Sequence, residues 1–423
     1  MQLGLSLAAF LLLGVAGGLL FMMGAIQLSQ EGLDSQQAMQ TFMLAASLLL
    51  GGGLILPSAW FAWQRLQPAI PVPPGLESQP ELPSPMPRQR HRLLILISMI
   101  LMLLALLAGD WVARNHQLAW LWLPGLNLLV VGLPVLWLVL VGKQRLPGGS
   151  LQRQWGIFAG GLEISPAIIL IIEPLVLLGI GSLVVLAAAL NPSLGRELSF
   201  LIYRLAHATP DMEELLNLLS PYLLRPTILA GIFTYTAVLV PLIEEALKPA
   251  GLWLLAGRRL TPAEGFVGGL LSGAGFALFE NLGATSAGGE TWALLAVSRT
   301  TTALLHMLTA GLTGWALSLA CSRRRYLHLG LTYAGVVILH GLWNALGIAS
   351  FALPQLKISS IPPADLELYS SLAMVVLGVM AGVNLLLYLG FNRRLSRALV
   401  HSPAVGDPQT LDLGQDPGLD PLP

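Results

Sequence analysis

Charged residues and cysteine are both scarce in this chain of 423 residues. Only 10% of its residues are Asp, Glu, Lys or Arg, whereas an ordinary soluble domain carries about 25%. Hydrophobic residues make up 55% of the chain and the mean hydropathy is +0.73, so a soluble globule and a disordered protein are both excluded. The single cysteine, Cys321, excludes an internal disulfide, a CxxC motif and a thiolate metal cluster.

An excess of either charge is also absent, because 22 basic residues balance 22 acidic ones. A strongly basic chain would point to nucleic acid, so this balance predicts no nucleic-acid partner. The N-terminus lacks the basic segment of a secretory signal and continues into a long apolar run. We therefore interpret it as a first membrane span and not as a cleaved signal peptide.

Long apolar runs are abundant in the chain. A helix needs about 20 apolar residues to cross a bilayer, and only helices satisfy their own backbone groups in lipid over such runs. We therefore predict an all-α fold, a polytopic helical membrane protein with ten transmembrane helices. The predicted spans lie near residues 3–28, 42–63, 93–113, 118–142, 166–190, 227–256, 263–285, 292–320, 327–350 and 367–391.

The loops between these spans differ sharply in their content of basic residues. Alternate loops, together with the C-terminal tail, hold 15 of the 22 Lys and Arg residues. Basic loops remain on the cytoplasmic side of a membrane. We therefore predict a multi-pass protein of the plasma (inner) membrane with both termini in the cytoplasm.

The segments outside the spans divide the chain into two membrane regions and a tail. Residues 1–142 form a predicted four-helix region, whose loop 64–92 is a Pro-rich cytoplasmic linker. Residues 157–391 form a predicted six-helix region that is interrupted by an amphipathic extramembrane segment at 191–226. That segment is interpreted either as a helical hairpin on the outer surface or as a lid that docks substrate. The polar tail 392–423 is predicted to be disordered.

Ionisable side chains inside the spans are the most informative residues, since each costs about 3 kcal/mol at mid-bilayer unless it is paired or faces water. The sixth span contains Glu244, Glu245 and Lys248 within the sequence VLVPLIEEALKPAG. Their i,i+3 and i,i+4 spacing lets Lys248 pair with either carboxylate. Because the surrounding sequence is so apolar, we predict that these three residues have a catalytic or binding role and do not form a purely structural ion pair.

Spans seven to nine add further polar groups. Their shallow positions near the outer surface predict a structural ion pair between Glu280 and Arg299. His306, His340 and an acid of span six lie deeper, near mid-membrane, and we predict that they form a reactive cluster. Spans six to nine are therefore the predicted catalytic core. The accompanying side chains on these spans are Phe276, Asn281 and Asn344.

Four short motifs on these consecutive spans resemble those of a known family. They are EEALK at 244–248, FALFEN at 276–281, RTTTALLHMLTAG at 299–311 and HGLWN at 340–344. In this order they look like the PrsW family of intramembrane proteases, which is related to the CAAX prenyl endopeptidases and the bacterial CPBP membrane proteins. The resemblance covers roughly residues 227–350.

The resemblance implies an intramembrane endopeptidase that cleaves a membrane protein or a membrane-proximal peptide in the lipid bilayer. By carry-over, one of Glu244 and Glu245 activates the attacking water. We assign this role to Glu244, with Glu245 forming hydrogen bonds or orienting the groups around it, although the sequence leaves the choice between the two open. His306 or His340 would protonate the leaving amine, and His340 with Asn344 would polarise the scissile carbonyl. The residues implied to support them are Lys248, Phe276, Glu280, Asn281 and Arg299.

Several alternatives remain open at the level of sequence. The glutamate mechanism requires no metal or other cofactor, and none is expected. The rival chemistry is a zinc hydrolase with His306, His340 and one glutamate as ligands, which the absence of an HExxH motif disfavours. The alternatives to a peptidase are a proton-coupled membrane transporter and a non-catalytic membrane scaffold. The charged motifs occupy one half of the chain only, which disfavours a transporter built from two repeated halves.

Overall fold

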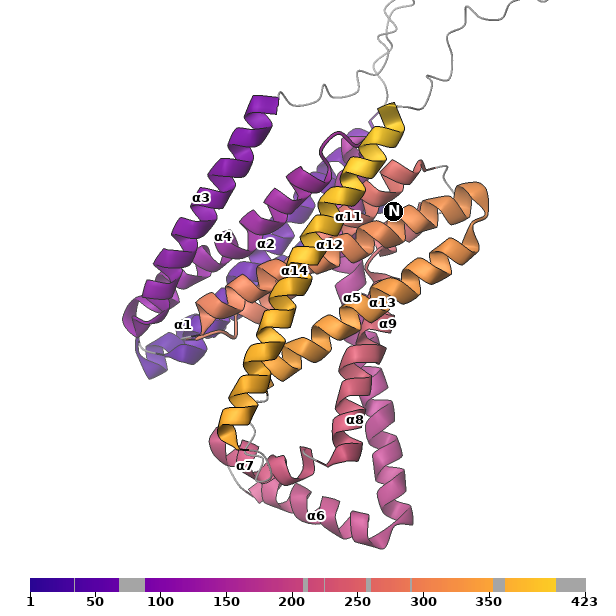
Figure 1. Ribbon diagram of the computed structural model, residues 1–423. Coiled ribbons are helices and arrows are strands. Elements are labelled where there is room, and N and C mark those ends of the chain that lie inside the picture. The colour runs from indigo at the N-terminus through magenta and orange to yellow at the C-terminus, as the bar shows by residue number, and fades with distance from the viewer. Residues whose placement is uncertain are drawn as a thin grey trace, which may run out of the picture.

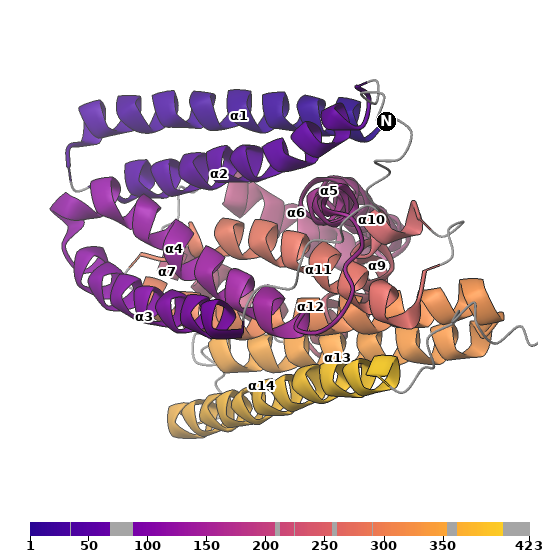
Figure 2. The same ribbon diagram turned by 90° about the horizontal axis from the view of Figure 1, so that it is seen from above.

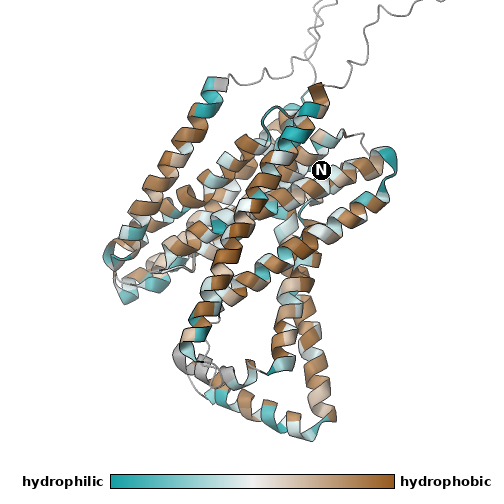
Figure 3. Cartoon of the chain, in the orientation of Figure 1, coloured by the Kyte–Doolittle hydropathy of each residue, from teal (hydrophilic) through white to brown (hydrophobic). Residues whose placement is uncertain are grey.

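The computed structural model describes residues 1–33, 35–67, 88–207, 212–223, 225–255, 260–289, 291–352 and 362–400. Within these ranges it contains helices and no strands (Figure 1). Ten of the helical stretches are long and apolar enough to cross a membrane, and hydrophobic residues predominate along them (Figure 3). The predicted all-α, multi-pass membrane fold is therefore confirmed. The Pro-rich linker and the polar tail fall largely outside the described residues.

The first four membrane helices form two antiparallel pairs. Helix α1 (Gln2–Glu31) lies along α2 (Gln36–Gln64), and α3 (Arg88–Ala113) lies along α4 (His116–Gly142), as Figure 2 shows. The side chain of Ser35 caps α2 by accepting a hydrogen bond from the backbone N–H of Ala38, which is the usual role of serine at this position. Both pairs also contact the second half of the chain through α11 and α12.

Helices α11 (Pro262–Thr285) and α12 (Trp292–Arg323) form the centre of the second region, and most residues of both are buried. Thr261 and Glu264 form a capping box at the start of α11, which satisfies backbone N–H groups that the helix leaves unpaired. Helix α5 (Leu151–Leu190) packs on one side of α11, and α13 (Tyr326–Ala352) and α14 (Pro363–Val400) lie beyond α12 (Figure 2).

Close helix packing around α11 depends on its glycines. A Cβ atom at Gly269 would lie 2.0 Å from the carbonyl oxygen of Ala310 on α12, and one at Gly275 would lie 2.3 Å from the carbonyl oxygen of Phe158 on α5. Small residues allow such close approach of membrane helices. Side chains on the two neighbouring helices are thereby held at fixed depths relative to α11.

A Gly269→Ala variant is expected to unfold about 1–3 kcal/mol more easily than the wild type, because the added methyl group forces α11 and α12 apart. Thermal unfolding in detergent measures this loss. Gly283→Ala is the matched control on the same helix, since nothing lies within 4 Å of a Cβ at that position. Equal stability of the two variants would contradict the packing argument.

The sixth span is not one regular helix. It consists of α8 (Pro226–Thr234), the π-helical turn η1 (Tyr235–Leu239), α9 (Val240–Leu247) and α10 (Ala250–Trp253). Two prolines explain the interruptions, because a proline lacks the backbone N–H that continues a helix. Pro241 is the second residue after the π-turn, and Pro249 separates α9 from α10. Such π-turns are frequently found at functional sites.

Two helices extend beyond their predicted bounds. Helix α14 continues to Val400, so residues 392–400 of the tail that was predicted to be disordered are helical. Helix α5 begins at Leu151, where Ser150 caps it, and not near residue 166 as predicted. Its 40 residues correspond to about 60 Å, which is twice the thickness of the hydrocarbon core. The segment at 191–226 contains α6 (Pro192–His207) and α7 (Met212–Leu223) at the far end of α5 and α8 (Figure 1). None of the residues of α6 is buried.

Candidate active site

The acids of the sixth span lie on α9, immediately after the π-turn. Glu244, Glu245 and Lys248 are all buried, and the Nζ atom of Lys248 lies 2.7 Å from Oε1 of Glu245 and 3.1 Å from Oε2 of Glu244. The ammonium group also sits 4.8 Å from the ring centroid of Phe276. The sequence predicted pairing of Lys248 with either acid, and the structure shows it beside both.

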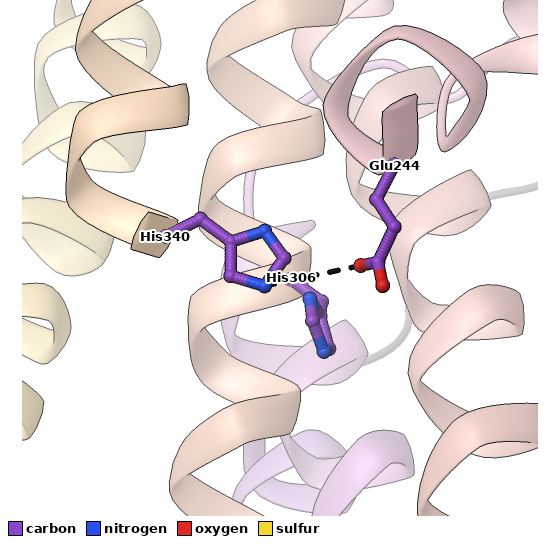
Figure 4. A group of neighbouring side chains, drawn as sticks. All are labelled: Glu244, His306 and His340. Atoms are coloured by element: carbon purple, nitrogen blue, oxygen red, sulfur yellow. Dashed lines mark ion pairs between the residues drawn. The ribbon is translucent and has the colours of Figure 1, made fainter. Parts of the chain in front are cut away.

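His340 on α13 connects these two glutamates. Its Nδ1 lies 2.9 Å from Oε1 of Glu245, and its Nε2 lies 3.8 Å from Oε2 of Glu244 (Figure 4). A carboxylate on one ring nitrogen fixes the orientation of an imidazole and leaves the other nitrogen available. Glu245 therefore directs Nε2 of His340 towards Glu244.

His306 on α12 has a carboxylate neighbour of its own. Its Nε2 lies 2.6 Å from Oε2 of Glu280, and the other oxygen of Glu280 lies 2.6 Å from Nη2 of Arg299. Asn281 holds Arg299 in place, because its side-chain oxygen accepts a hydrogen bond from Nε and its amide donates one to the backbone oxygen of Arg299. The predicted ion pair between Glu280 and Arg299 is confirmed.

The predicted separation of that ion pair from the reactive cluster is wrong. Counting residues from the outer end of each span placed Glu280 closer to the membrane surface than His306. The two side chains are nevertheless in contact. Counting along each helix compares backbone positions, whereas side chains lean towards the N-terminus of their own helix. Because α11 and α12 pack antiparallel, the side chains of Glu280 and His306 lean towards each other and meet. Glu280 therefore belongs to the same cluster as the two histidines.

Three buried side chains from three helices converge on one point. One ligand atom each from Glu244, His306 and His340 lies within 4.8 Å of the other two, and the two imidazole rings are nearly perpendicular with centroids 5.3 Å apart (Figure 4). Nδ1 of His306 has no hydrogen-bond partner among the residues that the structure describes. Two histidines and a carboxylate are a donor set found in catalytic zinc sites.

Asn344 and Tyr333 on α13 contact the interrupted span. The side-chain amide of Asn344 donates a hydrogen bond to the backbone oxygen of Thr236 at 3.0 Å, and the hydroxyl of Tyr333 donates one to the backbone oxygen of Leu242 at 2.6 Å. The π-turn and Pro241 disturb the regular pairing of such carbonyl groups. Tyr333 thus holds α9, which carries the acids, against α13, and Asn344 holds the π-turn η1 against the same helix.

Glu173 on α5 is a further acid near the site, and the sequence reasoning missed it. It lies within electrostatic range of Glu244, Glu280 and Lys248, and its Oε1 is buried without a hydrogen-bond partner among the described residues. The available signal was a lone carboxylate in the apolar sequence IIEPLVLL of the fifth span. A charge in such a run has a functional role by default.

Comparison with known proteins gives one match. A family model described as PrsW family intramembrane metalloprotease matches residues 166–383. The match extends from α5 into α14 and includes the acids and histidines described above. No curated protein and no solved structure matches the chain.

Proposed function

The chain belongs to the PrsW family of intramembrane metalloproteases, and from this premise we propose that the buried cluster hydrolyses a peptide bond with the help of a divalent metal ion. The observation that carries this proposal is the convergence of Glu244, His306 and His340, three donors from separate helices. It replaces the metal-free mechanism expected from the sequence. The substrate would be a membrane protein or a membrane-proximal peptide.

The donor atoms suit a divalent cation such as zinc. Nδ1 of His306 is buried and lacks a hydrogen-bond partner among the described residues, which leaves it free to act as a ligand. Glu280 contacts the other nitrogen of this ring, and Glu245 contacts Nδ1 of His340. Carboxylates in these positions are the usual partners of metal-bound histidines.

The formal charges around the cluster also favour a cation. Acids outnumber bases by two, and buried charge of this kind requires compensation. A divalent ion would balance the difference. The groups counted are the acids Glu173, Glu244, Glu245 and Glu280 and the bases Lys248 and Arg299.

Each residue then has a distinct task. A bound divalent ion supplies Lewis-acid stabilisation of the developing oxyanion and makes water a nucleophile at neutral pH. Glu245 and Lys248 hold His340 and Glu244 in position. The side chain of Glu280 is 34% exposed, against 11% for Glu244 and 0% for Glu245. Among these three acids it has the most exposed side chain. We therefore assign to Glu280 the role of accepting the proton of the attacking water and transferring it to the leaving amine.

A Glu280→Gln variant is expected to lose activity roughly 10²–10⁴-fold, because an amide cannot accept that proton. It should also be less stable, since Arg299 loses its anionic partner. Arg299→Gln separates the two effects, because it removes the ion pair and keeps the carboxylate. Steady-state cleavage rates and thermal unfolding of both variants measure the difference. Equal cleavage rates in the two variants would contradict the assignment of Glu280 as the base.

The metal itself is tested on protein purified in detergent. We expect elemental analysis to find one equivalent of metal, o-phenanthroline to abolish cleavage of a transmembrane peptide library, and added zinc to restore it. His306→Ala should lose the metal, whereas His328→Ala, an exposed histidine on α13, should retain it. Full cleavage by metal-free protein would restore the metal-free mechanism, and the absence of any cleavage by the wild type would refute the peptidase.

The membrane orientation is part of the same proposal. The protein would lie in the plasma (inner) membrane, and the positions of the basic loops predict that both of its termini are in the cytoplasm. Helices α6 and α7 would then lie at the outer membrane surface, at the far end of α5 and α8 (Figure 1). Accessibility labelling of cysteines introduced into α6, measured against the natural Cys321, tests this orientation in intact cells.

A further inference from the structure

A cavity of about 550 Å³ lies apart from the catalytic cluster. It is partly open and is lined by the first turns of α1, the end of α2, the first half of α5, α10 with the residues after it, and the start of α11. Its volume falls in the range of about 300–1,000 Å³ that ligand sites occupy. The side chains of the catalytic cluster are not among its lining residues.

Glu163 on α5 gives the cavity an unpaired carboxyl group. Its Oε1 is buried without a hydrogen-bond partner, and the residue makes no ion pair, within the part of the chain that the structure describes. A carboxylate inside a membrane helix is costly unless it is paired or faces water. This position therefore suits a ligand that brings a cation with N–H donors.

The two other charged side chains of the lining, Arg153 and Glu264, are paired with each other. Arg153 donates a hydrogen bond to Glu264, and Glu264 also accepts bonds from the backbone and the hydroxyl of Thr261. The lining thus holds two carboxylates, one guanidinium group and the α-amino group of Met1, a balance that suits a zwitterionic ligand. A guanidinium group has five N–H donors, so Arg153 can bind a further oxygen atom without leaving Glu264.

The rest of the lining combines neutral polar groups with apolar ones. The amide of Gln2 donates a hydrogen bond to the hydroxyl of Ser58 at 3.1 Å, and the hydroxyl of Ser6 donates another at 3.0 Å. Leu5 and Ile164 contribute apolar surface. A ligand that fits this lining has a cationic end, hydrogen-bonding atoms and an apolar body.

The position of the cavity identifies the source of such a ligand. It lies where α1, α5 and α11 begin and α2 ends, which is the end of the bundle that carries the basic loops and meets the membrane surface. Lipids are the abundant molecules there with a polar head and an apolar body. We propose that this cavity binds the headgroup of an ethanolamine phospholipid, with Glu163 accepting hydrogen bonds from its ammonium group and Arg153 contacting its phosphate.

A lipid in this cavity would support the backbone beside the catalytic acids. Ser165, two residues after Glu163, donates a hydrogen bond to the backbone oxygen of Leu247 at 2.9 Å. Gly160 packs directly on Gly251, where a Cβ would lie 3.0 Å from the neighbouring Cα. Filling the cavity stabilises this contact between α5 and α10, so bound lipid should raise the unfolding temperature.

Native mass spectrometry of the detergent-purified protein tests the proposal with phosphatidylethanolamine, phosphatidylcholine and phosphatidylglycerol added separately. Phosphatidylcholine keeps the positive charge but has no N–H donor, and phosphatidylglycerol has no cation. We expect the ethanolamine lipid to bind most tightly to the wild type and about tenfold more weakly to Glu163→Gln. It should also give the largest increase in unfolding temperature.

Two further variants make the test decisive. Glu197→Gln, an exposed acid on α6, should keep the wild-type preference. Gly156→Leu should abolish binding while Glu163 is intact, because a Cβ at Gly156 meets only the flexible end of Gln2 and the longer side chain fills the cavity. The proposal is overturned if the three lipids bind equally, if Glu163→Gln keeps the preference, or if soluble glycerophosphoethanolamine binds and the lipid does not.

Discussion

A Glu244→Gln variant is expected to fold, insert into the membrane and lose cleavage activity about a thousandfold or more. The amide has the shape of the carboxylate but lacks the charge that binds a divalent ion. Lys248 keeps its closer partner, Glu245, at 2.7 Å, so the change does not leave the buried ammonium group without an anion. The loss should therefore appear in activity and metal content, and not in stability.

Cleavage of a co-expressed membrane reporter, metal content and thermal unfolding measure these three properties together. Glu197→Gln is the control, because it makes the same chemical change at an exposed ion pair with Arg225. Glu245→Gln should also abolish cleavage, through the misplaced imidazole of His340. If Glu244→Gln and Glu245→Gln both cleave the reporter as well as the wild type does, the peptidase assignment fails.

Replacing Lys248 should have the largest effect on stability. Its side chain is completely buried beside Glu244 and Glu245, so Lys248→Met leaves two buried acids without their cation. Removal of one partner from a buried ion pair costs about 3–5 kcal/mol. We expect a strongly reduced unfolding temperature or a failure to accumulate in the membrane.

The double variant Lys248→Met, Glu245→Gln provides the control for this prediction. It removes one negative charge together with the positive one, and it should recover a large part of the lost stability. Expression level and thermal unfolding of the two variants measure the recovery. A fully stable Lys248→Met protein would contradict the role of Lys248 as the cation that compensates the buried acids.

The membrane fold and much of the site could be predicted from the sequence for simple physical reasons. Apolar runs of bilayer length leave helices as the available structure, and the ten predicted spans correspond to ten helical stretches in the part of the chain that the structure describes. Acids and histidines are rare in such runs, so Glu244, His306 and His340 could be singled out from their positions alone. Because spans six to nine are consecutive and were expected to pack together, the convergence of these three side chains could be predicted as well.

The features that the sequence did not reveal depend on contacts between distant segments. The meeting of Glu280 with His306 depends on how their side chains extend towards each other between the antiparallel helices α11 and α12. The π-turn at Tyr235–Leu239 follows from Pro241 together with partners on α13. Glu173 was overlooked because a single acid on a fifth helix has no spacing pattern to identify it. Local patterns carry no information on these three-dimensional arrangements.

The glycine contacts of α11 restrict how a substrate can reach the cluster. Gly269 and Gly273 bring α11 against the backbone of α12, and Gly275 brings it against α5, so neither neighbour can slide without a backbone collision. His306 on α12 and Glu280 on α11 therefore lie on the side of the site whose helices are held in a fixed position. Entry of a polypeptide from the bilayer requires movement on the opposite wall, where η1 and α9 meet α13 and where the residues of α8 are exposed to the surroundings.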